Sequence, residues 1–450
     1  MKKLATLLLA AGMVVASTAP ANAVDVKVDG RYRFSFMTGE TEFEGANKEV
    51  VQQRLRLGLT MAASENLSGY FQIQAGKDKW GTDESNAGNK NIQTRMVYID
   101  WKVPATSIKV RMGRHQFGLP AEAFGNNSIL ASGYGCRDGI VVSAPVTDWL
   151  GLTGIWARLG SNGLDVDQAD NNDMFAVAAN VKFDGFSGAV YGAYAALDKF
   201  AEKAVKDCHG QPVTDDDGEP TYTSTFPGNS AGLPNAEGDL YGFGFTSTFT
   251  FFDPFTLKLS AAFTEFNAAD KADKDAAGWN VQAKASYALP FGTPVFGAWY
   301  FSGADKDGKG VMPGAGYFTA TRSYHDEAKG LQGLYGGEGA VAGSWGVQAG
   351  IEGVSFLEGL SHDFLVTYMQ GTNEVAPSNY YTTYNSKGYW NLHEDDSLVH
   401  IDLVNTYKIY KNLAAHFELG YVFSDFDSKS WNAGLTEDDW RAELTFEYKF

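Results

Sequence analysis

Beyond its first 23 residues, the sequence lacks any apolar run of 18 residues, the length that a transmembrane helix needs. It is also poor in positive charge, with 36 Lys and Arg against 54 Asp and Glu and a net charge of −18. This balance argues against nucleic acid as a partner, because a phosphate backbone attracts basic surfaces. The sequence therefore excludes transmembrane helices in the mature chain and argues against nucleic-acid binding.

Cysteine is scarce, with only Cys136 and Cys208 in the chain. Both fall in segments that we expect to be loops, and disulfides persist in the compartments that secreted chains reach. Sequence spacing does not show whether two thiols come close enough to bond. Two alternatives stay open, a disulfide between the two loops or two free thiols.

The first 23 residues have the composition of a secretory leader. Met1-Lys2-Lys3 is basic, residues 4–15 are apolar, and Ala21-Asn22-Ala23 fits the cleavage rule for signal peptides. The apolar stretch is too short to span a bilayer, which disfavours an N-terminal membrane anchor. We predict Sec export and a mature chain of residues 24–450. Loss of Lys2 and Lys3 leaves 34 basic and 54 acidic residues in that chain.

The mature chain is rich in apolar residues but alternates them with polar ones. Hydrophobic residues make up 44% of the sequence, including 30 Phe, 22 Tyr and 10 Trp. A period of two is typical of a strand whose two faces meet different surroundings. The last strand alternates in this way and ends on Tyr448 and Phe450, which we interpret as a membrane assembly signal on the closing strand of an outer-membrane β-barrel. Its apolar positions are Trp440, Ala442, Leu444, Phe446, Tyr448 and Phe450.

Short and long connections between such strands follow one another along the chain. The predicted short turns include Glu65-Asn66, Pro104-Ala105, Asp253-Pro254 and Lys411-Asn412. The predicted long loops are acidic and cover residues 80–90, 161–172, 197–235, 267–277, 304–340 and 372–396. This order predicts an all-β, antiparallel up-and-down transmembrane barrel, with short turns in the periplasm and long loops outside.

We predict about 18 strands, with 16 as the next choice, and no second domain. A barrel of 16–18 strands has an open lumen, since only barrels near eight strands fill themselves with side chains. A soluble array of β-sandwiches shares the period of two and is the alternative fold.

Basic residues gather on the face of the first five strands that lies opposite the apolar face. Because neighbouring strands lie about 5 Å apart, these residues could form a ladder of positive charge on one wall of the lumen. Arginine stays charged at any relevant pH, and rings of basic residues favour anions. The alternative is a set of lumen charges that are paired with nearby acids and have no effect on solutes. The set comprises Arg31, Arg33, Arg54, Arg56, Lys109 and Arg111, with Arg114 just beyond and Arg95 on a strand that alternates poorly.

The segment from His115 to Gly135 is unusually apolar for a loop in contact with solvent. It contains a single acid, Glu122, and its apolar residues are Phe117, Leu119, Pro120, Phe124, Ile129, Leu130 and Tyr134. A loop folded into the barrel would bury these residues against the wall. We therefore predict a constriction loop at about residues 115–135.

Residues 110–116, Val-Arg-Met-Gly-Arg-His-Gln, followed by this loop, resemble the fifth strand and inward-folded third loop of trimeric general porins. The whole mature chain is similar in pattern to the homotrimeric porins of sulfate-reducing bacteria. The resemblance implies wall positions for Arg54, Arg56, Arg111 and Arg114 and a loop position that narrows the pore for Glu122. The chain departs from the family pattern by offering few loop acids, which weakens any expectation of cation preference.

The resemblance also implies location and partners. It implies a homotrimer in the outer membrane of a Gram-negative bacterium, in contact with lipid and lipopolysaccharide. During biogenesis the partners would be the barrel assembly machinery and periplasmic chaperones.

Two charge signs compete in this chain, because the long loops are acidic while the predicted lumen is basic. Screening over about 8 Å in physiological salt makes the nearest charges dominate permeation. We therefore predict a porin for passive diffusion of small hydrophilic solutes and ions, with weak anion preference. A solute-selective porin for phosphate, sulfate or organic acids is the alternative. A gated uptake receptor is disfavoured because strand patterning begins within a few residues of Val24, which leaves no room for a plug domain.

Catalytic and metal sites are weaker candidates. His325-Asp326 and His362-Asp363 are adjacent pairs, but no serine or second acidic pair is placed convincingly beside either, so we do not expect an outer-membrane hydrolase. Four acids, Asp165, Asp167, Asp170 and Asp173, could hold loop-bound calcium, although the EF-hand glycine and glutamate are missing. A solvated acidic loop is the alternative, and no other cofactor is predicted.

Overall fold

The structure of the chain is a computed structural model. It describes residues 24–40, 49–80, 92–125, 129, 136–161, 171–197, 202–204, 222–224, 237–269, 275–307, 309–313, 343–375, 392–430 and 438–450. The predicted leader, residues 1–23, lies outside the described residues. No helix in the described ranges is long and apolar enough to cross a membrane.

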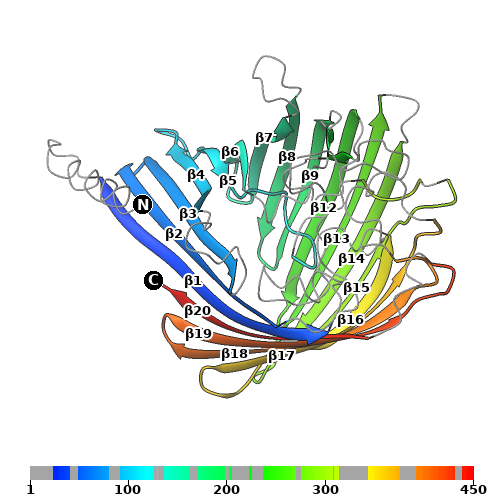
Figure 1. Ribbon diagram of the computed structural model, residues 1–450. Helices are drawn as coiled ribbons and strands as arrows, with labels where there is room; N and C mark the ends of the chain where they lie inside the picture. The colour runs from blue at the N-terminus through cyan, green and yellow to red at the C-terminus, as the bar shows by residue number, and fades with distance from the viewer. Residues whose placement is uncertain are drawn as a thin grey trace.

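Eighteen antiparallel strands form one closed barrel (Figure 1). Each strand pairs with the next along the chain, and β1 pairs with both β2 and β20, which closes the ring. The strands are β1 (Asp25–Glu40), β2 (Val50–Ser64), β3 (Leu67–Lys79), β4 (Ile92–Lys102), β5 (Lys109–His115), β6 (Arg137–Pro145), β7 (Leu150–Ser161), β8 (Asn171–Phe183), β9 (Phe186–Leu197), β12 (Gly238–Phe252), β13 (Phe255–Ala268), β14 (Ala276–Tyr287), β15 (Thr293–Phe301), β16 (Ser344–Leu357), β17 (Leu360–Gly371), β18 (Ser397–Tyr410), β19 (Leu413–Asp425) and β20 (Asp439–Lys449). Two short strands, β10 (Glu202–Ala204) and β11 (Tyr222–Ser224), pair separately.

The connections alternate strictly between two rims. One rim carries turns of two to six residues, and the other carries loops of seven to 42 residues. The chain begins β1 and ends β20 on the short-turn rim, where Gly30 and Phe450 exchange backbone hydrogen bonds of 2.9 and 3.1 Å. The predictions of 18 strands and of alternating short and long connections are confirmed.

The two faces of the wall meet different surroundings, as the period of two predicts. Val26 and Val28 of β1 and Phe175 and Val177 of β8 are exposed on the outer face, while polar residues of β1, β2 and β20 are buried on the inner face. A row of aromatic contacts on the outer face follows the short-turn rim. It joins Trp149 to Phe183, Phe183 to Phe186 and Phe186 to Phe249, with ring centroids 5.5, 6.3 and 5.2 Å apart. Such aromatic girdles flank the apolar band of membrane barrels.

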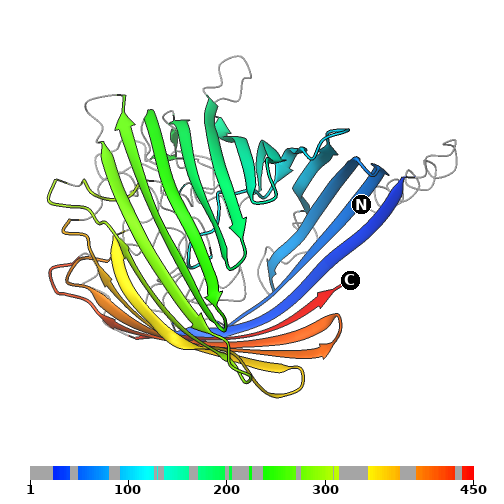
Figure 2. The ribbon, with the colours of Figure 1, turned by 180° about the vertical axis from the view of Figure 1, so that it is seen from behind.

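Part of the lumen is filled by the chain itself. The inner faces of β7–β9 and β12–β15 carry buried apolar residues, among them Met174, Leu240 and Phe266. Residues of two connections, such as Ile129 after β5 and Met312 after β15, belong to the same apolar cluster. The remaining opening is therefore displaced towards the wall of β1–β5. Figures 1 and 2 both show β1–β3 and β12–β15 on opposite sides of the molecule.

Candidate functional site

The segment that follows β5 crosses the lumen, which agrees with the predicted inward fold. The Ala121 carbonyl accepts a hydrogen bond of 2.8 Å from the Thr246 hydroxyl on β12, and the Ala123 amide donates one of 3.0 Å to the Ser260 hydroxyl on β13. Phe124 reaches Trp299 on β15, which lies eight strands from β5 in the ring of eighteen. We call residues 116–125 and 129 the constriction loop, because they start at β5, pack against β12, β13 and β15 and so narrow the lumen.

An aromatic column fixes the point where the constriction loop leaves the wall. Tyr70 on β3, Tyr98 on β4, His115 on β5 and Phe117 follow one another, with ring centroids 5.2, 5.7 and 5.1 Å apart. The Arg111 guanidinium lies 4.2 Å from the centre of the Tyr98 ring, which is the geometry of a cation–π contact. These contacts connect the start of the loop to the inner faces of three strands.

Glu122 anchors the far end of the loop. Its carboxylate accepts hydrogen bonds from the Tyr191 hydroxyl on β9, at 3.2 Å, and from the Gln282 amide on β14. The residue is only 3% exposed. The prediction that Glu122 narrows the pore opposite the arginines is wrong, because its carboxylate is buried against the wall that lies across the lumen from them.

Gly297 on β15 gives the loop the space that it occupies. A Cβ atom at this position would lie 2.5 Å from the Phe124 ring. We expect Gly297→Val to displace Phe124, because overpacking a site of this kind costs about 1–3 kcal/mol, and to give a larger and noisier single-channel conductance in planar bilayers. Gly154→Val on β7 is the matched control, since a Cβ there meets nothing within 4 Å. Equal conductance of the two variants would contradict this role of Phe124.

The wall that faces the loop carries the predicted arginine ladder on β1 and β2. Arg31 pairs with Arg56 across the two strands, and Arg33 pairs with Arg54. The Glu447 carboxylate on β20 binds Arg33 at 2.7 Å and Arg31 at 3.6 Å. Arg33 and Arg54 are 5% and 2% exposed, whereas the Arg31 side chain is 29% exposed. Arg31 is therefore accessible to lumen water, while Arg33 and Arg54 are buried within the wall.

Two further arginines are held by neutral amides. The Arg56 Nε donates to Gln74 at 2.8 Å, and the Arg95 Nη1 donates to Gln72 at 3.0 Å. Arg95 joins the lumenal face because the register between β3 and β4 shifts beside Gln72, and such a bulge also explains why its strand alternates poorly in the sequence. A glutamine amide that accepts from a guanidinium fixes the direction in which that guanidinium points.

The remaining members of the predicted ladder differ in position. Arg111 is half-exposed and makes a two-pronged ion pair with Asp100, at 2.6 and 2.7 Å. Lys109 lies opposite Lys102 in the register of β4 and β5, at the short-turn rim and away from the constriction loop. The alternative of lumen charges paired with nearby acids therefore describes Arg31, Arg33 and Arg111.

Arg114 is not part of the lumenal wall. It pairs with Val97, which is 48% exposed on the apolar outer face, so the prediction that Arg114 lines the constriction is wrong. The reason is that β5 keeps its alternation up to His115, which puts Arg114 on the face opposite Arg111. There the Arg114 guanidinium binds both oxygens of Asp138, at 3.0 and 2.7 Å.

The outer charges continue on the next strands as a ladder near the long-loop rim. Asp138 pairs with Arg158 and Arg158 with Asp173, and the Arg158 guanidinium donates to Asp173 at 2.9 and 3.2 Å. Asp173 was predicted as a calcium ligand, and its carboxylate is occupied by Arg158. The other predicted ligands, Asp165, Asp167 and Asp170, lie outside the described residues.

Cys136 lies half-buried just before β6. Burial raises the pKa of its thiol, and the nearby charges of Arg95 and Arg56 act in the opposite direction. Cys208 lies outside the described residues, so the disulfide between the two stays a prediction.

Sequence reasoning missed a second basic group on the opposite wall. Five polar residues lie on one line across neighbouring strands, each directly opposite the next in the strand register. They are Lys182 on β8, Ser187 on β9, Thr248 on β12, Lys258 on β13 and Lys284 on β14. We call Lys182, Lys258 and Lys284 the lysine row. Alternation places Lys258 and Lys284 on the lumenal face, but only the pairing of strands shows that all three lie on one line.

No protein-family model and no curated protein matches the sequence. Several solved structures are similar in fold. OprD of Pseudomonas aeruginosa matches with a TM-score of 0.58 and 12% identity over 95% of both chains. OccAB4 of Acinetobacter baumannii matches with a TM-score of 0.55 and 9% identity over 96% of this chain and 100% of that one.

A third similar structure is OccK2 (OpdF) of Pseudomonas aeruginosa in complex with glucuronate, with a TM-score of 0.56 and 13% identity over 95% and 98% of the two chains. At these identities the similarity shows the fold, which is the closed 18-strand barrel of OprD-like outer-membrane porins. These structures are not trimeric general porins, so the resemblance seen in the sequence holds at the coarser level of the porin fold.

Proposed function

We propose that this chain forms a water-filled channel in the outer membrane of a Gram-negative bacterium, for passive diffusion of small hydrophilic solutes and ions with weak anion preference. One observation carries the proposal. The constriction loop faces a wall on which Arg31, Arg56, Arg95 and Arg111 are accessible, while the single acid of the loop segment, Glu122, is buried on the far side. Asp100 binds Arg111 and Glu447 binds Arg31, but the four arginines outnumber these two acids. The fixed charges nearest to a passing ion are therefore mainly positive, which favours anions.

The membrane location rests on the outer surface. Its apolar residues are exposed, and an aromatic girdle follows the short-turn rim. The ladder from Arg114 to Asp173 lies near the opposite rim, where polar headgroups would meet it. Sec export, the homotrimer, contact with lipopolysaccharide and help from the assembly machinery and chaperones remain proposals that rest on the sequence.

A solute-selective anion channel is the second candidate. Gln72 and Gln74 hold the side chains of Arg95 and Arg56 in fixed positions, and a preorganised cationic wall suits selective binding of phosphate, sulfate or organic acids. Block of the single-channel current by one of these anions at micromolar concentration would favour this candidate. We propose no catalytic activity, and the solved structures similar to this chain are porins.

The reversal potential across a planar bilayer under a KCl gradient tests the main proposal. We expect its sign to indicate anion preference, and we expect liposomes that contain the protein to swell in solutions of small neutral sugars. A clear cation preference would refute the proposed charge selectivity. Absence of any conductance from correctly folded protein would refute the channel itself.

A further inference from the structure

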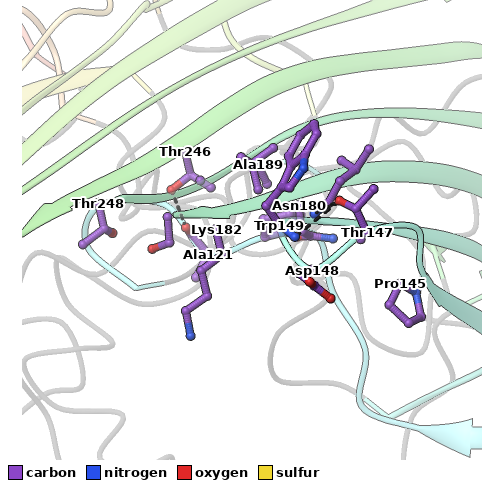
Figure 3. A pocket seen from close by; sticks show the side chains of 16 residues that line it. Ala121, Pro145, Thr147, Asp148, Trp149, Asn180, Lys182, Ala189, Thr246 and Thr248 are labelled. Carbon is purple, nitrogen blue, oxygen red and sulfur yellow. Dashed lines mark hydrogen bonds between the residues drawn. The ribbon is translucent and has the colours of Figure 1, made fainter. Parts of the chain in front are cut away.

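A hollow of about 470 Å³ lies inside the barrel on the short-turn side of the constriction loop. Pro120 and Ala121 of the loop bound it on one side, and the turn between β6 and β7 bounds it on the other. Figure 3 shows the hydrogen bond between Thr246 and Ala121 and the Lys182 side chain, which reaches away from the sheet. The hollow can therefore hold a solute that has passed the constriction loop on its way to the short-turn rim.

The lining of this hollow favours an anion. Lys182 lies beside the hydroxyl groups of Ser187 and Thr248, and Asp148 is the only acid among the described residues that line the hollow. The row of strand pairs continues from Thr248 to Lys258. Strands about 4.8 Å apart place the backbones of Lys182 and Lys258 about 14 Å from one another, with the two hydroxyl residues between them. The flexible stems of the two lysines allow their ammonium groups to approach a ligand from both sides.

The charges of the lysine row are only partly compensated. Lys258 and Lys284 lie directly opposite one another, an arrangement that is destabilising for like charges. The Glu352 carboxylate binds Lys284 at 3.2 Å. In the described part of the chain, no carboxylate lies within ion-pair distance of Lys182 or Lys258. An anion bound between Lys182 and Lys258 would offset the repulsion between Lys258 and Lys284.

We propose that Lys182 and Lys258, with the Ser187 and Thr248 hydroxyls, form a binding site for a small oxyanion on the short-turn side of the constriction loop. Ammonium groups supply charge-assisted hydrogen bonds, and hydroxyls supply further donors, which together match the oxygens of phosphate, sulfate or a carboxylate. This inference rests on the proposed channel function. It adds a second anion site across the lumen from the arginines and nearer the exit.

Inorganic phosphate is the probe for this site. Single-channel KCl currents are recorded in planar bilayers while phosphate is added to either side in turn, with sulfate and acetate in parallel runs that distinguish the oxyanions. We expect phosphate to interrupt the wild-type current, more strongly from the short-turn side. Loss of two charge-assisted contacts in the double variant Lys182→Gln, Lys258→Gln should weaken that block about tenfold, with each block measured against the phosphate-free KCl current of the same variant.

Two matched controls locate the effect. Lys411→Gln removes the same charge from the turn between β18 and β19 on the same rim, and Arg114→Gln removes one from the outer face of the barrel wall. Both should leave the phosphate block nearly unchanged. Equal weakening by either control, an unaffected double variant, or a conducting wild-type channel without any phosphate effect would overturn the site and leave the channel proposal standing. A folded wild-type protein that does not conduct would overturn both.

Discussion

Exchanging Arg56 and Arg95 together for glutamate is expected to change the preferred ion from anion to cation. Both arginines reach the lumen beside the constriction loop, and both are held by glutamine side chains. A glutamine amide carries donors as well as an acceptor, so Gln74 and Gln72 can turn to hold a carboxylate instead of a guanidinium. The exchange therefore reverses the local charge while the wall keeps partners for the new residues.

The reversal potential under a KCl gradient measures this effect. Four units of charge change within a few ångströms of the ion path, well inside the screening distance of about 8 Å in physiological salt, so the sign of the potential should invert. Arg95→Gln alone should give an intermediate value. Persistent anion preference in the double variant would show that selectivity lies elsewhere.

Arg114→Gln is the matched control for Arg95→Gln. Both substitutions remove one guanidinium from neighbouring strands, but Arg114 lies on the outer face beside Val97. We expect Arg114→Gln to leave the reversal potential at the wild-type value. An equal shift for the two variants would contradict the assignment of Arg114 to the outer face.

Gly30→Val is expected to prevent closure of the barrel. A Cβ atom at Gly30 would overlap the Phe450 ring, and the backbones of these two residues exchange the hydrogen bonds that end the seam between β1 and β20. Above them the seam is held by the Arg33–Glu447 ion pair and by a hydrogen bond of 2.6 Å between the hydroxyls of Ser35 and Thr445. Displacement of Phe450 therefore opens the seam at the short-turn rim.

The fraction of folded barrel, read from the heat-dependent mobility of the protein in gels, measures this effect. We expect a large loss for Gly30→Val and no loss for Gly154→Val, whose side chain meets open space. Phe450→Ala in the Gly30→Val background removes the clash and should restore folding in detergent. Failure of that double variant to fold in detergent would show that the terminal ring itself stabilises the seam.

The alternation of faces made the fold predictable. A wall with hydrocarbon on one side and water on the other imposes a period of two on every strand, and turns such as Asp253-Pro254 and Lys411-Asn412 lie where the sequence places them. The inward fold of the constriction loop was predictable from its composition. Phe117, Leu119 and Phe124 are too apolar for a loop that is surrounded by water, so they were expected to pack against the barrel wall.

The details that failed depend on how strands pair, which local patterns do not specify. Arg95 reaches the lumen through a bulge, which local alternation does not show. Arg114 lies three residues beyond Arg111, an odd number, so the alternation of β5 puts it on the opposite face. The lysine row emerges only when β8, β12 and β13 are placed in register. Glu122 was assigned to the wrong side of the pore because its partners, Tyr191 and Gln282, are distant in sequence.

The constriction loop also has a mechanical consequence. It ties the strands that carry its ends to β12, β13 and β15, which lie five, six and eight strands from β5 in the ring of eighteen. Lateral pressure flattens a hollow barrel by changing the distance between wall segments that face one another across the lumen. The constriction loop joins two such segments and resists that change. We therefore expect the width of the pore to change little with bilayer tension, and the single-channel conductance to be similar in thin and thick bilayers.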